Sequence, residues 1–310
     1  MKTSPPGSHL KAYLALFAGL FSVGFSAIFV RQADAAGTMT AFYRMGIAAV
    51  LVAIPFLRLA WRQQFRLSRS GVLLAVLGGF FFAGDLALWT TGITLSGATM
   101  PTLMANTAPL WVGLGSMLLF REQQNRLFWL GLVVAMGGAA LILGQDLQQA
   151  AGAGLGTFLG LLAAIFYGGY YLATQRGRDF LSTLAYFWIA TASSAVFLLV
   201  LNLLLGRPFT GYDRPTYLYF LALGVVVQVF GWLAINYAQG YLPASIVAPT
   251  LLGQPIVTAI LAVLLLKEAF SPWHIAGGVV VLAGVYLVHW SRSVGRGFGK
   301  MRPVSKIDPI

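Results

Sequence analysis

Ten long apolar stretches dominate this chain of 310 residues. Each runs for about 18 to 24 residues with almost no charge, which is the length that an α-helix needs to cross a hydrocarbon core about 30 Å thick. Lipid offers no partners to backbone N–H and C=O groups, so a spanning segment bonds them within its own helix. The stretches, which we number as spans 1 to 10, are 11–31, 38–59, 71–92, 98–120, 126–145, 155–175, 182–205, 215–238, 243–266 and 271–291. The sequence therefore predicts an all-α integral membrane protein with ten transmembrane helices.

The charged residues of the chain are few and unevenly placed. Asp, Glu, Lys and Arg make up 9% of the residues, against about 25% in soluble domains, and the net charge is +12. If the N-terminus lies inside, fifteen of the 20 Lys and Arg residues fall on the inner side and four on the outer side. This asymmetry follows the positive-inside rule. It predicts cytoplasmic N- and C-termini, and it explains the basic balance without a nucleic-acid partner.

One sequence pattern occurs twice, at an offset of 146 residues. Residues 109–122 read PLWVGLGSMLLFRE, and residues 255–268 read PIVTAILAVLLLKE. The offset divides the chain into two halves of five spans, and the odd number inserts the second half upside down relative to the first. Inverted repeats of this kind are typical of secondary transporters, which expose a site near the membrane midplane to each side in turn.

The repeat also sets the expected domain boundaries. The expected parts are a cytoplasmic N-terminal tail at 1–10, a first five-helix repeat at 11–145, a second, inverted repeat at 155–291 and a basic cytoplasmic tail at 292–310. Arg121-Glu122 and Lys267-Glu268 close the two copies of the repeated pattern. We interpret both pairs as interfacial ends of spans 4 and 9.

Pro109 and Pro255 occupy corresponding positions near the middle of spans 4 and 9. A proline cannot donate a hydrogen bond to the carbonyl four residues earlier, which here frees the carbonyls of Ala105 and Leu251. A free carbonyl in the hydrocarbon is costly unless protein, water or a ligand satisfies it. The prolines therefore predict two kinks, which act either as gates beside a central site or in helix packing alone.

Two charged residues lie well inside the spans, Arg44 in span 2 and Asp85 in span 3. Counted from the outer ends of their spans they lie at similar depth, so a direct pair is geometrically feasible. Ionisable groups inside a membrane are costly and mark candidate functional sites. Three roles stay open: the pair holds spans 2 and 3 together, it binds substrate, or Asp85 exchanges protons.

Three amides lie deepest in the apolar stretches: Asn106, Gln228 and Gln254. An amide inside the membrane must bond another helix, water or a ligand. These three residues are candidates for contacts with the polar groups of a substrate. The alternative is that they hold helices together.

Several aromatic residues lie away from the interfacial belts where such residues usually gather. Phe25, Trp89 and Tyr167 lie within spans 1, 3 and 6. They are candidates for the apolar wall of a central cavity lined by spans 1, 3, 4, 6, 8 and 9. The alternative is ordinary packing between helices.

Sequence motifs of soluble enzymes do not occur in the chain. The sequence has no G-x-x-x-x-G-K-[ST], G-x-S-x-G or H-E-x-x-H pattern, each of which would indicate a specific catalytic or nucleotide site. Its 3 histidines are too sparse for a metal centre, and it has no cysteine. We therefore expect no enzymatic activity, no cofactor and no metal. A channel and an intramembrane enzyme remain as alternatives to a transporter.

Several of these features occur together in one known superfamily. The five plus five spans, the FYRMGIA stretch at 42–48 and the proline-led span 4 that ends in Arg-Glu resemble the drug/metabolite transporters. The similarity covers the whole chain and is closest to the ten-helix EamA family of bacterial exporters, within it to the aromatic amino-acid exporter branch. The resemblance implies a multi-pass protein of the bacterial inner membrane that works by alternating access through a central, largely hydrophobic cavity.

We therefore expect a secondary transporter that exports amino acids with aromatic or other apolar side chains. Its expected partners are the amphipathic substrate and membrane lipid, and a monomer would suffice. The alternative within the same family is an exporter of broad specificity for drugs, nucleosides or other metabolites.

Overall fold

The computed structural model of the chain describes residues 8–62, 67–96, 99–143, 153–266 and 272–294. All regular structure in these ranges is helical. Within them, nine helical stretches are long and apolar enough to cross a membrane, and Arg126–Ile142 is a shorter apolar helix. Each of the ten predicted spans is thus helical, either as one helix or as consecutive helical segments, and the predicted fold class is confirmed.

Each half contributes five spans to the bundle. In the first half they are α1–α2 (Ser8–Gly24 and Ser26–Gln32), α3 (Gly37–Trp61), α4 (Arg69–Ser96), α5–α6 (Thr99–Ala105 and Ala108–Phe120) and α7 (Arg126–Leu143). In the second half they are α8 (Ala153–Gly177), α9 (Thr183–Leu204), α10–η2–α11 (Arg214–Ala222, Leu223–Trp232 and Leu233–Gln239), α12–η3–α13 (Ala244–Thr250, Leu251–Gly253 and Gln254–Leu266) and α14 (Pro272–Val294).

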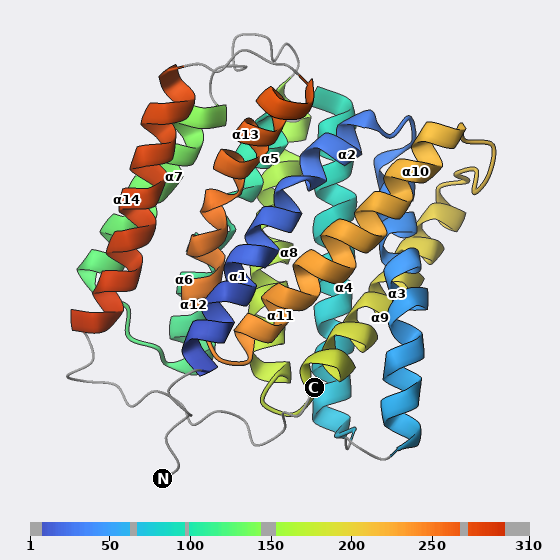
Figure 1. The fold of residues 1–310 in the computed structure, drawn as a ribbon, viewed down its shortest axis with the longest axis horizontal. Helices are drawn as coiled ribbons and strands as arrows, with labels where there is room; N and C mark the ends of the chain where they lie inside the picture. Colours follow the sequence, from blue (N-terminus) through green and yellow to red (C-terminus); the bar gives the residue numbers. More distant parts are fainter. Residues whose placement is uncertain (1–7, 63–66, 97–98, 144–152, 267–271, 295–310) are drawn as a thin grey trace.

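The main helix contacts join the two halves (Figure 1). The helix α4 lies along α8, α1 lies along η2 and α11, and α3 lies along α9. The last spans of the two halves, α7 and α14, lie side by side at one end of the bundle. Helices α6, α8 and α11 end on the side where α1 begins, which we call the N-terminal face. Any space at the centre of this bundle is therefore bounded by both halves.

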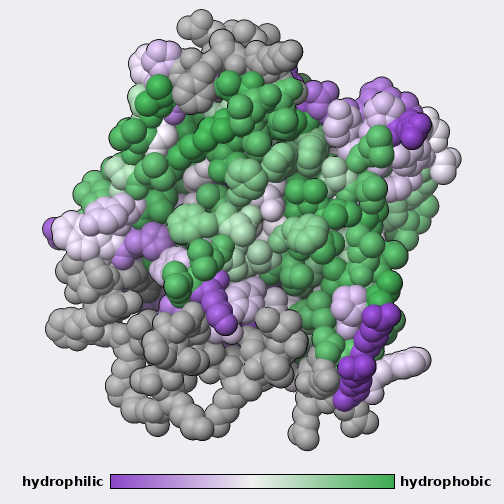
Figure 2. Space-filling view, viewed as in Figure 1, coloured by the Kyte–Doolittle hydropathy of each residue, from purple (hydrophilic) through white to green (hydrophobic). Residues whose placement is uncertain are grey.

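The outer surface is that of a multi-pass membrane protein. Figure 2 shows hydrophobic side chains over most of the middle of the bundle, with polar ones gathered mainly toward its ends. Leu118 and Leu204 are about four-fifths exposed, at 81% and 80%. In water such an extensive apolar surface would drive association, whereas in a bilayer it faces acyl chains.

Glycines allow α7 and α14 to approach each other closely. A Cβ atom on Gly131 would lie 2.8 Å from the carbonyl oxygen of Gly284, and one on Gly138 would lie 2.7 Å from that of Gly277. Both separations are shorter than real Cβ contacts, and the obstructing atoms are backbone atoms that cannot rotate away. Small residues permit this kind of close helix contact in membranes.

We expect Gly138→Ala to lower the thermal stability of the protein, because overpacking of a tight interface costs about 1–3 kcal/mol. Gly137→Ala is the matched control, since a Cβ atom on Gly137 meets nothing within 4 Å. The unfolding temperature in detergent, followed by intrinsic tryptophan fluorescence, should fall for the first variant and stay near wild type for the second. Equal unfolding temperatures for the two variants would contradict the close α7–α14 contact.

Spans 4 and 9 are interrupted at corresponding positions. Asn106 and Thr107 separate α5 from α6, and the 3₁₀ turn Leu251–Gly253 separates α12 from α13. Pro109 and Pro255 follow in the first turns of α6 and α13, where a missing N–H costs little. The two predicted kinks are thus breaks that begin a few residues before the prolines. Discontinuous spans at matching positions of two repeats commonly form the site of a transporter.

Two further helix irregularities, in spans 1 and 8, are not associated with a proline. Span 8 contains a π-helical segment, η2. π-Helices are rare overall, and those that occur are often at functional sites. Span 1 is interrupted at Phe25, between α1 and α2. Its counterpart in the second half, α8, is continuous. The two halves therefore share a topology but differ in detail.

Helix ends at both faces carry specific caps. The Asp213 carboxylate accepts a hydrogen bond of 3.0 Å from the backbone N–H of Thr216 at the start of α10. Hydrogen bonds from Thr216 lower the pKa of Asp213 below its ordinary value, so this cap is charged at neutral pH and would weaken only in acid. Arg121 ends α6 in the left-handed conformation, with φ of 54°, which supports the interpretation of this position as a helix end.

Candidate functional site

A cavity lies at the centre of the bundle, beside the interrupted spans. Its lining residues come from both halves and are Val23, Ser26, Arg44, Phe82, Asp85, Leu86, Trp89, Thr102, Ala105, Asn106, Tyr167, Trp232 and Gln254. The centres of water molecules can occupy about 60 Å³ of this cavity. A buried water needs about 10–15 Å³ by this measure, so the cavity holds a few waters. A larger ligand would require it to widen.

A second, smaller cavity of about 10 Å³ adjoins the first and shares Ala105, Asn106, Tyr167 and Gln254 with it. Asn106 lies in the break of span 4, and its side-chain Nδ2 is buried without a hydrogen-bond partner among the described residues. An unsatisfied buried donor costs about 1–3 kcal/mol. Asn106 therefore offers a donor that water or a ligand would satisfy.

Arg44 is a buried cation whose side chain is held in one orientation, with 4% of its surface exposed. Its Nε donates a hydrogen bond to Oε1 of Gln228 at 2.9 Å, and its Nη1 donates to Oγ of Ser26 at 3.3 Å. The guanidinium carbon lies 5.7 Å from the centre of the Phe82 ring, within the range of a cation–π contact. Three different elements, η2, α2 and α4, therefore fix this guanidinium in the cavity wall.

Asp85 lies in the wall of the same cavity and is 7% exposed. Within the described part of the chain, no hydrogen bond or ion pair joins its carboxylate to another group. Arg44 and Asp85 thus do not form the direct pair that their similar depths allow, because the guanidinium is bonded to Gln228 and Ser26 instead. The cavity wall thus carries a guanidinium and a carboxyl group that do not bond to each other.

Aromatic rings form a layer beside the cavity. Phe82 stacks on Tyr170 with ring centres 4.4 Å apart and meets Trp232 edge-on at 4.7 Å. The Tyr171 hydroxyl donates to the Tyr167 hydroxyl at 2.9 Å, and the Trp232 ring lies within about 6 Å of both tyrosines. The layer joins α4, α8 and η2, so it closes the space between the two halves with apolar surface.

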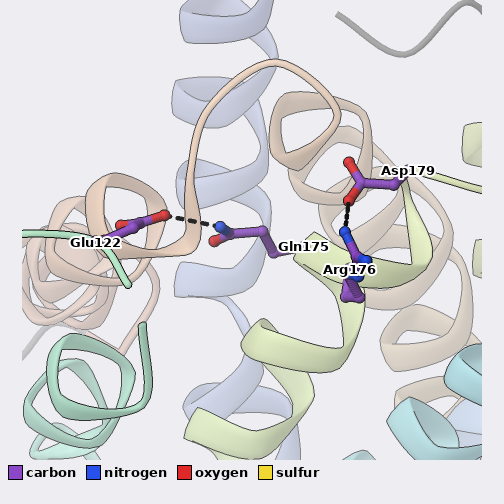
Figure 3. A network of polar contacts seen from close by, with 4 residues as sticks. All are labelled: Glu122, Gln175, Arg176 and Asp179. Carbon is purple, nitrogen blue, oxygen red and sulfur yellow. Dashed lines mark hydrogen bonds and ion pairs between the residues drawn. The ribbon is translucent and has the colours of Figure 1, made fainter. Parts of the chain in front are cut away.

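A polar network joins the two halves at the N-terminal face. Glu122, just after α6, accepts hydrogen bonds from Nε2 of Gln175 at 2.9 Å, from Oγ of Ser245 at 2.8 Å and from Nε2 of Gln124 at 3.2 Å. Gln175 in turn accepts a bond of 2.6 Å from the backbone N–H of Ala244. Figure 3 shows Glu122 and Gln175 pointing toward each other. We call these five residues the Glu122 network.

The Glu122 network gives the repeated Arg-Glu pattern a second role. Besides ending span 4, Glu122 holds the ends of α8 and α12 to the first half. The corresponding Lys267-Glu268 pair lies outside the described residues.

The cavity brings together six of the predicted site residues and leaves four outside its lining. Those in the lining are Arg44, Asp85, Trp89, Asn106, Tyr167 and Gln254. Pro109 lines the adjoining smaller cavity, and Pro255 lines neither. Gln228 is fully buried and bonds Arg44 from behind. Phe25 packs between Phe21 and Phe29, with ring centres 5.6 and 5.5 Å away.

Sequence reasoning did not find Phe82 or Thr102 as members of the site. Thr102 accepts a hydrogen bond of 3.1 Å from the Trp89 indole, which links α4 to α5 across the cavity. Phe82 lies under the Arg44 guanidinium. Phenylalanine and threonine are both common in apolar spans, so the sequence does not distinguish Phe82 and Thr102 from packing residues.

Ten apolar spans in two inverted halves, with a central cavity at broken helices, define a membrane transporter of the inverted-repeat class. The family model of the EamA-like transporter family matches residues 10–144 and 154–290. The chain belongs to this family, within the drug/metabolite transporter superfamily.

Two individual proteins are also similar to this chain. An uncharacterized transporter of Methanothermobacter thermautotrophicus is 28% identical over 216 residues, which span 66% of this chain and 60% of that protein. A solved structure described only as the crystal structure of a protein has a TM-score of 0.76 and 16% identity, covering 90% of this chain and 97% of that chain. This second likeness supports the fold alone.

Proposed function

We propose that this transporter exports amino acids with aromatic or other apolar side chains. The proposal rests on one observation: the central cavity combines charged and amide groups with aromatic walls. Asn106 and Gln254 stand beside Tyr167, Trp89 and Trp232. Such a lining suits an amphipathic cargo, since apolar pockets with a few placed polar groups are the usual form of small-molecule sites.

Alternating access fits the arrangement of the two halves. The aromatic layer and the Glu122 network both join the first half to the second. The cavity has room for a few waters only, so cargo would enter after these contacts separate on one side. Pro109 and Pro255, next to the breaks of spans 4 and 9, are proposed to act in this opening. One chain supplies the whole lining, so a monomer would suffice.

The proposed location is the bacterial inner membrane, with the N-terminal face and both termini in the cytoplasm. Because the chain has no cysteine, single cysteines can report each face without background. A membrane-impermeant maleimide added to intact spheroplasts should label Thr210→Cys, in the exposed segment before α10, and leave Trp61→Cys, at the N-terminal face, unlabelled. The reverse pattern would show the opposite orientation.

The test of the proposed cargo is counterflow of labelled phenylalanine in proteoliposomes, with and without an imposed pH gradient. We expect saturable uptake that unlabelled phenylalanine, tyrosine and tryptophan inhibit. Flux that never saturates would indicate a channel. Saturable uptake of drugs or nucleosides, with no counterflow of any aromatic amino acid, would favour the exporter of broad specificity instead.

A further inference from the structure

The two ionisable residues in the cavity wall, Arg44 and Asp85, indicate which chemical groups a ligand of the cavity should carry. Arg44 uses Nε and Nη1 for Gln228 and Ser26, and within the described residues its Nη2 has no hydrogen-bond acceptor. A guanidinium has five N–H donors in a planar fork that matches a carboxylate. The protein thus fixes the orientation of the Arg44 guanidinium and leaves its Nη2 group for an anionic partner.

Asp85 makes the complementary demand. Its carboxylate is more than nine-tenths buried, lies in the cavity wall, and bonds no group within the described residues. When ionised, a carboxylate accepts hydrogen bonds and cannot donate them, and its charge is costly at this depth without a partner. A cationic donor in the cavity would satisfy it.

The absence of a direct bond between Arg44 and Asp85 argues against a purely structural pair. A pair that only joined α3 to α4 would gain most by direct contact, since burial penalises each charge left alone. Instead, Gln228 and Ser26 hold Arg44 while Asp85 stays unbonded. A ligand that carries both a carboxylate and an ammonium group would complete both interactions at once.

We propose that Arg44 binds the carboxylate and Asp85 the ammonium group of a zwitterionic amino acid, so that the two residues together select the cargo class. The inference rests on the proposed amino-acid transport. Trp89, four residues after Asp85 on α4, and Tyr167 line the same cavity and receive the apolar side chain. Asn106, with its unpartnered Nδ2, supplies a further donor.

The test compares ligands that lack one charged group. Competitors of phenylalanine counterflow are phenylalanine, 3-phenylpropionate, which lacks the ammonium group, and 2-phenylethylamine, which lacks the carboxylate. In the wild type, we expect each truncated ligand to bind about 30-fold more weakly than phenylalanine, or worse, because one buried charge then lacks its partner.

The variants Asp85→Asn and Arg44→Lys should each change the affinity of phenylalanine relative to one of the two truncated ligands. In Asp85→Asn, phenylalanine should lose its advantage over 3-phenylpropionate but keep it over 2-phenylethylamine. Arg44→Lys keeps the charge but loses the planar fork, so phenylalanine's advantage over 2-phenylethylamine should shrink most. The matched controls are Asp179→Asn and Arg176→Lys, which alter an exposed ion pair at the N-terminal face and should keep the wild-type order.

Three outcomes separate the proposals. If Asp85→Asn weakens phenylalanine and 3-phenylpropionate equally, the charge assignment is overturned while the proposed function stands. If the wild type carries no phenylalanine, the proposed cargo fails. The assignment of Arg44 and Asp85 is then tested by measuring whether other amino acids raise the unfolding temperature of the wild type. If none of them does, the assignment is overturned. Asp85→Glu serves as the second variant if Asp85→Asn does not fold.

Discussion

Glu122→Gln is expected to open the N-terminal face of the protein. The Glu122 carboxylate accepts bonds from Gln175 on α8 and Ser245 on α12, and each bond to a charged group contributes about 1.5–3 kcal/mol. The substitution removes the charge and places an NH₂ donor among donors. Because about 1.4 kcal/mol is a tenfold change in an equilibrium, the population of protein that is open at this face should rise about tenfold or more.

A single cysteine behind the Glu122 network measures this opening. Ala248 lines the smaller cavity and is 3% exposed, so Ala248→Cys should react slowly with a membrane-impermeant maleimide applied to the N-terminal face. Its labelling rate should rise about tenfold in Glu122→Gln. The Asp179→Asn control changes the ion pair with Arg176 at 2.9 Å, seen beside the network in Figure 3. Exposed ion pairs contribute little, so an equal rise in this control would contradict a specific role of Glu122.

Gln228→Glu is expected to weaken transport while it preserves the stability of the fold. Gln228 bonds Arg44 through Oε1 at 2.9 Å, and a glutamate keeps that acceptor while adding a negative charge. The new carboxylate would neutralise Arg44 and compete with the carboxylate of the proposed amino-acid cargo. We expect the apparent affinity for phenylalanine to fall about tenfold or more, since the charged contact with the cargo contributes about 1.5–3 kcal/mol.

Gln228→Leu provides the contrast for this prediction. Leucine leaves the Nε of buried Arg44 without an acceptor, which costs at least about 1–3 kcal/mol, so stability and transport should both fall. The readouts are the unfolding temperature and the concentration dependence of phenylalanine counterflow. If Gln228→Glu retains wild-type affinity, Gln228 only supports the fold and does not position Arg44 for cargo.

The positions of the spans could be predicted from the sequence because their length is dictated by the bilayer. The span expected at 38–59 is α3, Gly37–Trp61, and the span expected at 155–175 is α8, Ala153–Gly177. The breaks in spans 4 and 9 were also foreseeable, since Pro109 and Pro255 cannot donate backbone hydrogen bonds. The break of span 1 and the π-helical segment of span 8 have no comparable marker, because tertiary contacts decide them.

The membership of the cavity could be predicted only in part. Depth along a span follows from residue number, so Asp85, Asn106 and Gln254 were recognisable as buried polar groups. The direction of a side chain around its helix depends on the neighbouring helices, which the sequence does not place. For this reason the sequence did not show that Gln228, a candidate either for substrate contact or for holding helices together, lies outside the cavity lining and bonds Arg44.

The same reasoning applies to the ends of the spans. Glu122 was recognisable as a helix end because it closes an apolar run with Arg121. Its bonds to Gln175 and Ser245 connect segments 53 and 123 residues away along the chain. Contacts at such separations depend on the assembled bundle, and local sequence patterns do not reveal them.

The aromatic layer beside the cavity has a consequence for the energy supply of the cell. A membrane potential of 100 mV drives each monovalent ion with about 2.3 kcal/mol, so any continuous file of water through the bundle would dissipate that store. The rings of Phe82, Tyr170 and Trp232 are in mutual contact and interrupt such a file with surface that cannot solvate an ion. Vesicles whose membrane contains many copies of this protein should therefore hold an imposed membrane potential when no substrate is present. A cell could then keep many copies in its membrane without losing its membrane potential.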